Sequence, residues 1–324
     1  MEKLIVSSSP HITGKQDTQS IMRDVLIALL PTVLVGIWVF GLRALTMVLI
    51  SALSACVFEG LWNYFNKKDH SLYELSAAVT GTMVALILPT NSPWWIFVLA
   101  SGFAIIIAKQ LFGGLGQNFI NPALAGRAFV VASWPLLTTV FVKLGCDLPL
   151  FATVEMTDAM TGATPLYVAK TAHTLAPYSD LFIGKVPGCI GETSVIAILI
   201  GGIYLVARRV ITLHAPISYI VSIGIFGYIF GYQGLFTGDV FFSIFSGGVV
   251  FGAFFMITDY VTTPTTKAGQ VIAGIIAGFL TIIIRVKGGY PEGVSYAIML
   301  VNVITPLIDK YVSPKKYGRV AKNG

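Results

Sequence analysis

The sequence predicts an all-α polytopic membrane protein with ten transmembrane helices, arranged as two inverted five-helix repeats with a long outer loop after helix 5. The first supporting observation is composition: the chain of 324 residues is 55% hydrophobic and 11% charged, with a mean hydropathy of +0.81. Soluble domains carry about 25% charged residues. This composition therefore suits a protein whose apolar side chains face lipid. The other two observations are a series of apolar runs and a similarity between the two halves.

A search for runs of about 20 apolar residues identifies the predicted helices. One long polar segment, 143–190, separates the fifth span from the sixth. The ten candidate spans cover residues 24–40, 44–62, 75–90, 94–110, 119–142, 191–207, 214–232, 240–258, 269–286 and 294–309.

The basic residues predict the orientation of these spans. With ten spans, both termini lie on one side, which collects fourteen Lys and Arg residues against six on the other side. Because cytoplasmic loops carry the excess of Lys and Arg, we place both termini in the cytoplasm and 143–190 outside. The chain then begins with a cytoplasmic segment, 1–23, and ends with a basic cytoplasmic tail, 310–324. Between them lie a first membrane repeat, 24–142, the outer loop, 143–190, and a second membrane repeat, 191–309.

Two pairs of segments indicate an internal duplication. "GTMVALILPTNSP", which begins at Gly81, resembles "GAFFMITDYVTTP", which begins at Gly252. The segments after spans four and nine each place Gly-Gly before the next span, and that span contains an Asn and a Pro. A repeat with five spans must insert its copies in opposite orientations, as in many transporters. The alternative is that Gly, Pro and Thr are simply common in membrane helices.

Several polar residues lie in or beside the predicted spans. Arg127 falls inside the fifth span, where an arginine usually faces a partner, a cavity or a ligand, unless that span begins later in the chain. Asn118 and Asn121 share one helical face and offer donors and acceptors to a heterocycle, or they cap a helix before Pro122. Asp259, near the end of span eight, belongs to a cation path or caps a helix end.

The outer loop contains "TDAMTGATPL" at 157–166. Thr164 has no His at a suitable local spacing and no GxSxG elbow, so it is not a hydrolytic nucleophile. An accessible threonine after small Gly162 and Ala163, with Pro165 opposing helix continuation, suits covalent modification. The three cysteines form no CxxC and no Cys/His cluster with metal spacing, so we predict no metal site. No basic run is interleaved with aromatic residues as in nucleic-acid binding.

These motifs resemble those of a known family. Asp158-x-x-Thr161-Gly162-Ala163-Thr164 is similar to the D-x-x-[S/T]-G-A-[S/T] signature at which a flavin transferase attaches FMN through a phosphoester. Together with "SSSPHI" at 7–12 and "FGGLGQNFINPALAGRAF" at 112–129, it resembles the family of the D subunits of Rnf ion-translocating electron-transport complexes. The B subunit of the sodium-pumping NADH:quinone reductase is a relative. The resemblance covers essentially the whole chain.

The resemblance implies a function and a set of site residues. Thr164 corresponds to the FMN-bearing threonine, and Asp158, Thr161, Gly162 and Ala163 to the rest of the transferase recognition sequence. Asn118 and Asn121 correspond to amides near a bound riboflavin in the related B subunit, which leaves riboflavin in this chain open. Arg127 is added to the expected cofactor-binding residues because of its position inside the fifth span, not because of the resemblance.

The implied protein is a flavoprotein subunit in the bacterial inner membrane. It helps to pass electrons between ferredoxin and NAD and couples them to Na⁺ or H⁺ transport. Its partners are membrane lipid, a flavin transferase and the Rnf subunits of A, B, C, E and G type, because this chain has neither a dinucleotide-binding fingerprint nor an iron–sulfur cysteine set. The alternatives are a cofactor-free ten-helix transporter or channel, and the quinone reductase B subunit.

Overall fold

The computed structural model describes residues 17–67, 74–144, 149–151, 161–232, 234–290 and 292–312. Within these ranges the chain is mostly helical, with two short antiparallel strand pairs. The elements in chain order are α1 Thr18–Phe40, α2 Leu42–Asn66, α3 Ser76–Leu86, α4 Trp94–Gly102, η2 Phe103–Lys109, η3 Gln110–Phe112, α5 Pro122–Ser133, α6 Pro135–Thr138, β1 Phe141–Val142, β2 Thr161–Gly162, α7 Pro165–Ala172, α8 Tyr178–Ile183, α9 Val195–Ala207, α10 His214–Ile229, β3 Phe230–Gly231, β4 Gly234–Leu235, α11 Val240–Phe245, α12 Val249–Phe251, η4 Gly252–Met256, α13 Lys267–Lys287 and α14 Val294–Tyr311.

Helix lengths differ from the regular pattern of ten predicted spans. Among the described residues, four helical segments are long and apolar enough to cross a membrane: Thr18–Phe40, Leu42–Asn66, Trp94–Phe112 and Lys267–Lys287. Four other apolar helices, α3, α5, α9 and α10, have between 10 and 17 residues. About 20 residues are needed for a full crossing, so ten complete crossings remain a prediction.

Proline and polar residues end the short helices. The predicted span 75–90 is helical only to Leu86, because Pro89 and Pro93 bracket a "PTNSP" turn. The predicted span 119–142 ends its helix at Ser133, before Pro135. Proline lacks the N–H that an α-helix needs and disfavours helical geometry in the residue before it. Broken helices in a membrane-embedded bundle usually line a cavity.

Close helix packing depends on glycine at particular contacts. A Cβ atom on Gly201 of α9 would lie 2.0 Å from the carbonyl oxygen of Ala28 in α1. A Cβ atom on Gly81 of α3 would lie 2.6 Å from the carbonyl oxygen of Ser51 in α2. Small residues at these positions let the backbones approach closely, as is common between membrane helices. The α1–α9 contact joins the first half of the chain to the second.

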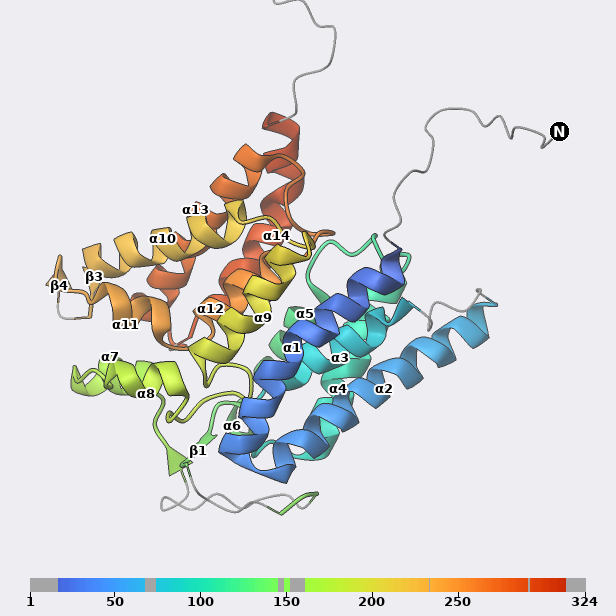
Figure 1. Cartoon of the computed structure of the whole chain (residues 1–324), viewed down its shortest axis with the longest axis horizontal. Helices are drawn as coiled ribbons and strands as arrows, with labels where there is room; N and C mark the ends of the chain where they lie inside the picture. Colours follow the sequence, from blue (N-terminus) through green and yellow to red (C-terminus); the bar gives the residue numbers. More distant parts are fainter. Residues whose placement is uncertain are drawn as a thin grey trace, which may run out of the picture.

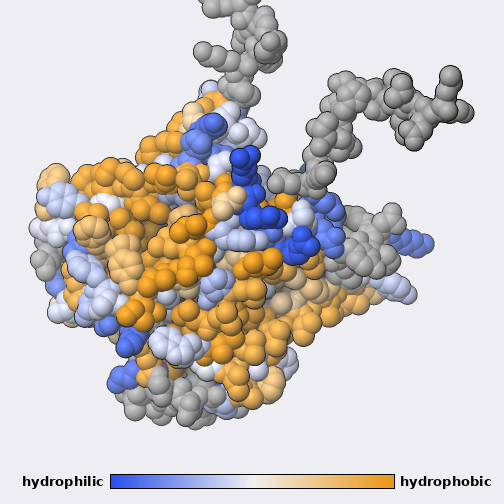
Figure 2. All heavy atoms as spheres, in the orientation of Figure 1, coloured by the Kyte–Doolittle hydropathy of each residue, from blue (hydrophilic) through white to orange (hydrophobic). Residues whose placement is uncertain are grey.

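The ends of the chain's described part and the helix that begins at Thr164 lie in different parts of the molecule. Figure 1 shows the end of α14 at the top and the start of α1 in the upper half, whereas α7, α8 and β1 lie in the lower half. Apolar residues cover most of the middle of the face in Figure 2, and hydrophilic residues gather mainly toward its edges. The two ends of the chain's described part thus lie on one side, opposite the segment that carries Thr164.

Two arginines that we counted as charges of the outer side are buried. Arg43 of α2 donates hydrogen bonds to carbonyl oxygens of Thr90 and Ser92 and, by a short contact, to Pro149. Arg285 of α13 is 1% exposed and also donates to backbone carbonyl groups. Both guanidinium groups donate to backbone carbonyl groups that lack a helical hydrogen-bond partner. Buried backbone carbonyl groups need such a partner. Their role is therefore structural rather than topological.

Candidate functional site

Thr164 begins a short helix in the predicted outer loop. Its side-chain oxygen accepts a hydrogen bond from the Tyr167 amide at 3.3 Å, so Thr164 is the N-cap of α7. Pro165 occupies the first helical position, where a missing N–H costs nothing. The segment before Thr164 is fixed as well, because β2 pairs with β1 in the register Phe141 with Gly162. The described part of the predicted loop thus forms an ordered platform that carries the helices α7 and α8.

A lysine fixes this platform to the second half of the chain. Lys170 of α7 donates a hydrogen bond to the carbonyl oxygen of Arg285 at 3.0 Å and, by a short contact, to that of Gly288. Both carbonyl groups lie at the C-terminal end of α13, where the last turn leaves acceptors without helical partners. A positive charge is also favoured there by the helix dipole. The position of Thr164 is therefore set by α13 as well as by its own loop.

Thr164 lines a cavity, which we call the threonine cavity. It has a volume of about 320 Å³ and lies between α5, α6, α7 and the start of α14. Small-molecule sites usually have volumes of about 300–1,000 Å³ and apolar or aromatic walls with a few polar groups. The cavity meets this description, with Arg127 and Glu292 as charged groups and with the aromatic side chains Phe141, Tyr167, Tyr290 and Tyr296 in its wall.

Arg127 holds a cluster of polar groups at the wall of the threonine cavity. Its guanidinium donates to Glu192 at 3.4 Å, to Ser295 at 3.0 Å and, by a short contact, to Glu292. The Cys189 thiol lies 3.9 Å from the same guanidinium. The sequence left Arg127 between a buried and an interfacial position, and the structure shows it largely buried with two carboxylate partners. The carboxylates offset the cost of its burial.

The two carboxylates of this cluster have opposite pKa shifts. Glu192 and Glu292 lie in the segments before α9 and α14, outside the helices. Burial, followed by the adjacent Glu292 carboxylate, raises the pKa of Glu192 well above its ordinary value. Burial would also raise the pKa of Glu292, but the charge of Arg127 outweighs it and holds this pKa below its ordinary value. Two carboxyl groups whose oxygens lie within 4.8 Å of each other cannot both ionise freely.

The cluster also bears on the prediction that no metal binds. Cys189, Glu192 and Glu292 bring their ligand atoms within 4.8 Å of one another, a spacing that a metal ion accepts. The Arg127 guanidinium contacts the same three groups and supplies the positive charge that a metal would bring. The sequence missed Glu192 and Glu292. An available signal was Arg127 itself, because an arginine buried in a membrane bundle needs acceptors, and a carboxylate is one of the two common kinds.

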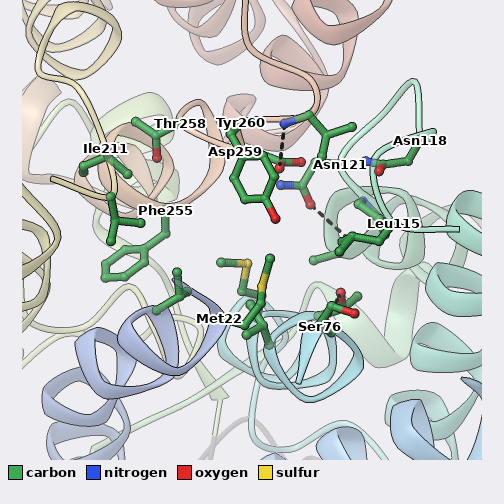
Figure 3. Close-up of a pocket in the computed structure, with 18 of the residues that line it drawn as sticks. Met22, Ser76, Leu115, Asn118, Asn121, Ile211, Phe255, Thr258, Asp259 and Tyr260 are labelled. Atoms are coloured by element: carbon green, nitrogen blue, oxygen red, sulfur yellow. Dashed lines mark hydrogen bonds between the residues drawn. The ribbon is translucent and has the colours of Figure 1, made fainter. Parts of the chain in front are cut away.

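Asn118, Asn121 and Asp259 line a second cavity, on the side where α1 begins, which we call the amide cavity. Figure 3 shows the two asparagines on one side and Phe255 and Ile211 on the other, with Met22 and Ser76 opposite Asp259. The structure thus brings together three residues that the sequence singled out separately. Its volume of about 90 Å³ is below the usual range for a ligand site. The thioether side chains of Met22 and Met83 in its wall are flexible.

The two amides retain one donor group and one acceptor for a ligand. The Asn121 side-chain oxygen caps α5 by accepting from Ala123 at 3.0 Å and Leu124 at 3.4 Å. The Asn118 side-chain nitrogen donates to the carbonyl oxygen of Ile120 at 3.1 Å. The capping interpretation of Asn121 is therefore confirmed. Within the part of the chain that the structure describes, these bonds leave the Asn121 amide nitrogen and the Asn118 amide oxygen without a partner and available to the cavity.

Asp259 forms local hydrogen bonds after η4. Its carboxylate accepts from the Val261 amide and the Thr262 hydroxyl, both at 3.3 Å. Burial raises the pKa of Asp259 above its ordinary value of 3.8, and these hydrogen bonds lower it only in part. These bonds hold a turn at 259–262 rather than the end of a helix, and the carboxylate lines the amide cavity. Lys109 also lines this cavity and forms a buried ion pair with Glu59 at 2.8 Å.

Helix α5 connects the two cavities. Its first residues, Pro122 and Ala123, line the amide cavity, whereas Arg127, Ala128 and Val131 line the threonine cavity. Twelve residues at 1.5 Å each give a helix about 18 Å long. The "NPALAGRAF" segment therefore forms a wall of both candidate sites.

Not every predicted site residue is described. Asp158 lies outside the described residues, as do Cys146 and the "SSSPHI" segment. Thr161 and Gly162 form β2, and a Cβ atom on Gly162 would lie 2.9 Å from Pro187. Ala163 is exposed, directly before Thr164. The small residues of the motif thus fit a crowded strand followed by an accessible threonine.

Comparisons with known proteins agree over nearly the whole chain. Residues 5–318 match the model of the NQR2, RnfD, RnfE family. The chain is 48% identical over 321 residues to the D subunit of the Na⁺-translocating ferredoxin:NAD⁺ oxidoreductase complex of Acetobacterium woodii, covering 97% of this chain and 95% of the relative. It is 41% identical over 324 residues to the D subunit of the proton-translocating ferredoxin:NAD⁺ oxidoreductase complex of Clostridium ljungdahlii, and the match covers 97% of this chain and 96% of the relative. The D subunit of the ion-translocating oxidoreductase complex of Alcanivorax borkumensis is 35% identical over 336 residues, and the match covers 99% of this chain and 98% of the relative.

Proposed function

The chain belongs to the NQR2, RnfD, RnfE family, and from that premise we propose that it is the D-type membrane subunit of an Rnf-type ferredoxin:NAD⁺ oxidoreductase complex. The complex couples electron transfer between ferredoxin and NAD to the translocation of Na⁺ or H⁺. The observation that carries this function is the similarity to D subunits of such complexes over at least 97% of the chain. Two of these relatives are named for different ions, so the ion is left as Na⁺ or H⁺.

The chain is a multi-pass membrane protein, as its apolar helices and its relatives indicate. We place it in the bacterial inner membrane, with both termini in the cytoplasm and Thr164 outside. The opposite positions of the chain's described ends and of α7 support this orientation. The short helices α3 and α5 and the segments η2 and η4 support a bundle of broken helices. The inverted repeat that we propose for this bundle rests on the similar segments that begin at Gly81 and Gly252.

Covalent FMN at Thr164 is the cofactor that we propose for the threonine cavity. The residues present fit it: Thr164 carries the hydroxyl for a phosphoester, and its cavity has the volume and the aromatic wall of a small-molecule site. The phosphate would lie at the N-terminus of α7, where backbone N–H groups favour an anion. When bound, the flavin supplies electron transfer, while the protein supplies its position and electrostatics. A flavin transferase would attach it, with Asp158, Thr161, Gly162 and Ala163 as recognition residues.

We propose riboflavin as the ligand of the amide cavity. The free amide nitrogen of Asn121 and the free amide oxygen of Asn118 form a donor–acceptor pair that complements the edge of a flavin ring. Apolar side chains make up most of the surrounding wall and suit a flat ring, with Asp259 and Lys109 as the charged groups beside it. The small volume requires Met22 and Met83 to move when the ligand enters. In this arrangement each end of α5 contacts one flavin.

The other activities of the complex belong to partner subunits. The sequence contains neither a dinucleotide-binding fingerprint nor the cysteine spacing of an iron–sulfur cluster, so we assign NAD and ferredoxin to subunits of the A, B, C, E and G types. Asp259 is our candidate for the ion path, because its charge faces the amide cavity. Unchanged ion transport by an Asp259→Asn complex would count against this assignment.

The test of the flavin site is in-gel fluorescence. The chain is expressed with an active flavin transferase and run on a denaturing gel beside Thr164→Ala and Thr171→Ala. The second variant removes another hydroxyl of the same short helix. We expect a fluorescent band in the wild type and in Thr171→Ala, and none in Thr164→Ala. A dark wild-type band would exclude covalent FMN and favour a cofactor-free transporter.

A further inference from the structure

The Arg127 cluster carries more negative charge than its central arginine neutralises. Arg127 contacts both Glu192 and Glu292, at 3.4 Å and by a short contact respectively. A second arginine, Arg285, directs its donors to the backbone carbonyl groups of Ser243, Ser246 and Glu292. Its charge acts on the carboxylates through space. One guanidinium therefore forms ion pairs with two carboxylates in a largely buried site.

Such an arrangement favours a shared proton. The carboxylate oxygens of Glu192 and Glu292 lie within 4.8 Å of each other. Two carboxylates at this distance in a water-poor site titrate as a pair, and one of them retains its proton into the neutral range. The other ionisable groups that face the pair are the Cys189 thiol, the Arg127 and Arg285 guanidinium groups and the phenol groups of Tyr219 and Tyr296. The Arg127 charge stabilises the single negative charge that remains.

The pair has a route to solvent and a vacant hydrogen-bonding position. Glu292 lines the threonine cavity, and its side chain is 17% exposed, against 6% for Glu192. Among the described residues, the Glu292 Oε1 atom is buried and has no hydrogen-bond partner. A protonated carboxyl group at either residue would supply the missing donor. On the other side, a Cβ atom on Gly248 would lie 2.9 Å from the Glu192 Oε1 atom, so glycine makes room for this carboxylate.

We propose that Glu192 and Glu292 hold one proton between them in the resting protein and take up a second proton from water when the flavin on Thr164 accepts an electron. This inference rests on the proposed function, which places the flavin in the cavity that Arg127 and Glu292 line. The electron comes from a redox centre of a partner subunit and adds one negative charge to the flavin. The proton forms one O–H bond on the carboxylate pair and restores the local charge. Both leave again when the flavin passes its electron on.

The electrostatic reason is the position of Arg127 between the two negative groups. While the flavin is oxidised, the Arg127 guanidinium stabilises the negative charge of the carboxylate pair alone. A negative charge on a flavin in the same cavity would compete for Arg127, whose charge otherwise holds the pKa of Glu292 below its ordinary value. With that charge drawn toward the flavin, Glu292 would bind a proton more tightly. The low-dielectric surroundings strengthen this coupling. The pair thus acts as a proton-binding site linked to the flavin, on the side of the molecule that carries α7.

The test is reduction-induced infrared difference spectroscopy of the purified, flavin-loaded complex. We expect flavin reduction to increase the C=O stretch of protonated carboxyl groups by about one carboxyl per electron, with a shift of the band in D₂O. Glu292→Gln should abolish this increase, and the control Asp180→Asn on α8 should keep it. An unchanged increase in Glu292→Gln, or no increase in the wild type while visible absorption shows a reduced flavin, would overturn the proposal.

A second measurement separates this inference from the proposed function. The Thr164→Ala complex carries no flavin on this residue, and static infrared spectra across the neutral pH range report the resting proton directly. We expect a protonated carboxyl band that Glu192→Gln in the same background removes. Its absence before the substitution would overturn the resting proton. A fluorescence-free wild type with this band present would instead remove the proposed flavin and leave the proton-sharing pair in place.

Discussion

The side-chain ammonium of Lys170 donates a hydrogen bond to the carbonyl oxygen of Arg285, 115 residues further along the chain, at 3.0 Å. This contact joins the helix that begins at Thr164 to the C-terminal end of α13. The side chain of Arg285 in turn donates hydrogen bonds to the carbonyl oxygens of Ser246, before α12, and Glu292, before α14. A segment that the sequence predicts only as a loop is therefore fixed to the second half of the bundle.

Lys170→Met should loosen α7 without unfolding the bundle. The substitution leaves two carbonyl groups of the α13 C-terminus without a charged donor, which costs about 1–3 kcal/mol. Because the contact is local, the effect should appear as faster hydrogen exchange in 165–172 rather than as a loss of fold. Lys287→Met is the matched control, since Lys287 is an exposed residue of the same helix end. Equal exchange in both variants would show that Lys170 does not anchor α7.

Two substitutions at Thr164 should separate helix capping from flavin attachment. Thr164→Ser keeps both the N-cap oxygen and a hydroxyl, so we expect a stable α7 and a fluorescent band. Thr164→Asn keeps a good N-cap but has no hydroxyl to esterify, so we expect a stable α7 and a dark band. Hydrogen exchange of α7 and in-gel fluorescence are measured on the same preparations. A dark band with an unfolded α7 in Thr164→Asn would mean that folding alone controls the modification.

Asn118→Leu should lower the amount of flavin that is released on denaturation. The variant removes the one free amide oxygen that Asn118 offers to the amide cavity, and a lost hydrogen bond of about 1.4 kcal/mol weakens binding about tenfold. Released and protein-bound flavin are quantified separately after denaturation. Gln117→Leu, at the exposed neighbouring position, should release as much flavin as the wild type. If neither wild type nor control releases flavin, riboflavin in the amide cavity is excluded.

Most helices follow from the sequence, and most side-chain partners do not. Each predicted span contains helical residues because a long apolar run can satisfy its backbone in lipid only as a helix. The early ends of the short helices were not predicted where apolar residues continue beyond the last helical residue. Residues 87–88, between the end of α3 and Pro89, are an example. The ion pairs Arg127–Glu292 and Lys109–Glu59 join residues 165 and 50 positions apart, which no local pattern specifies. The Asn121 cap was accessible to prediction because capping is a local pattern. The TGAT motif is local too, and the flavin on Thr164 stays a prediction.

Arg43→Gln should destabilise the break between α3 and α4. Arg43 is 1% exposed and bonds the carbonyl groups of Thr90 and Ser92 at 2.7 and 3.3 Å. The shorter amide cannot reach all of these acceptors, so the cost should be about 3 kcal/mol. Thermal unfolding in detergent reports the loss, with the exposed Arg209→Gln as a control. A midpoint equal to that of the control would show that water or lipid replaces the guanidinium.

The pH dependence of stability should identify the state of Asp259. Burial raises its pKa in the folded protein above the ordinary 3.8, so its protonated form is favoured by folding. This contribution is fully present below pH 3.8 and is lost as the pH rises through the raised value. Asp259→Asn does not titrate, and its amide oxygen can still accept the hydrogen bonds from Val261 and Thr262. The stability of the variant relative to the wild type should therefore increase between acidic and neutral pH.

The measurement for Asp259 is the thermal midpoint of both proteins across that pH range, with and without Na⁺. A bound Na⁺ would favour the ionised carboxylate, lower its pKa and reverse the trend, because an ion that binds only the folded form stabilises it. Na⁺ should then raise the midpoint of the wild type at neutral pH and leave that of Asp259→Asn unchanged. If Na⁺ shifts neither protein and the variant gains stability with pH, Asp259 is a partly buried carboxylate that only holds the turn after η4, and the ion path must lie elsewhere in the complex.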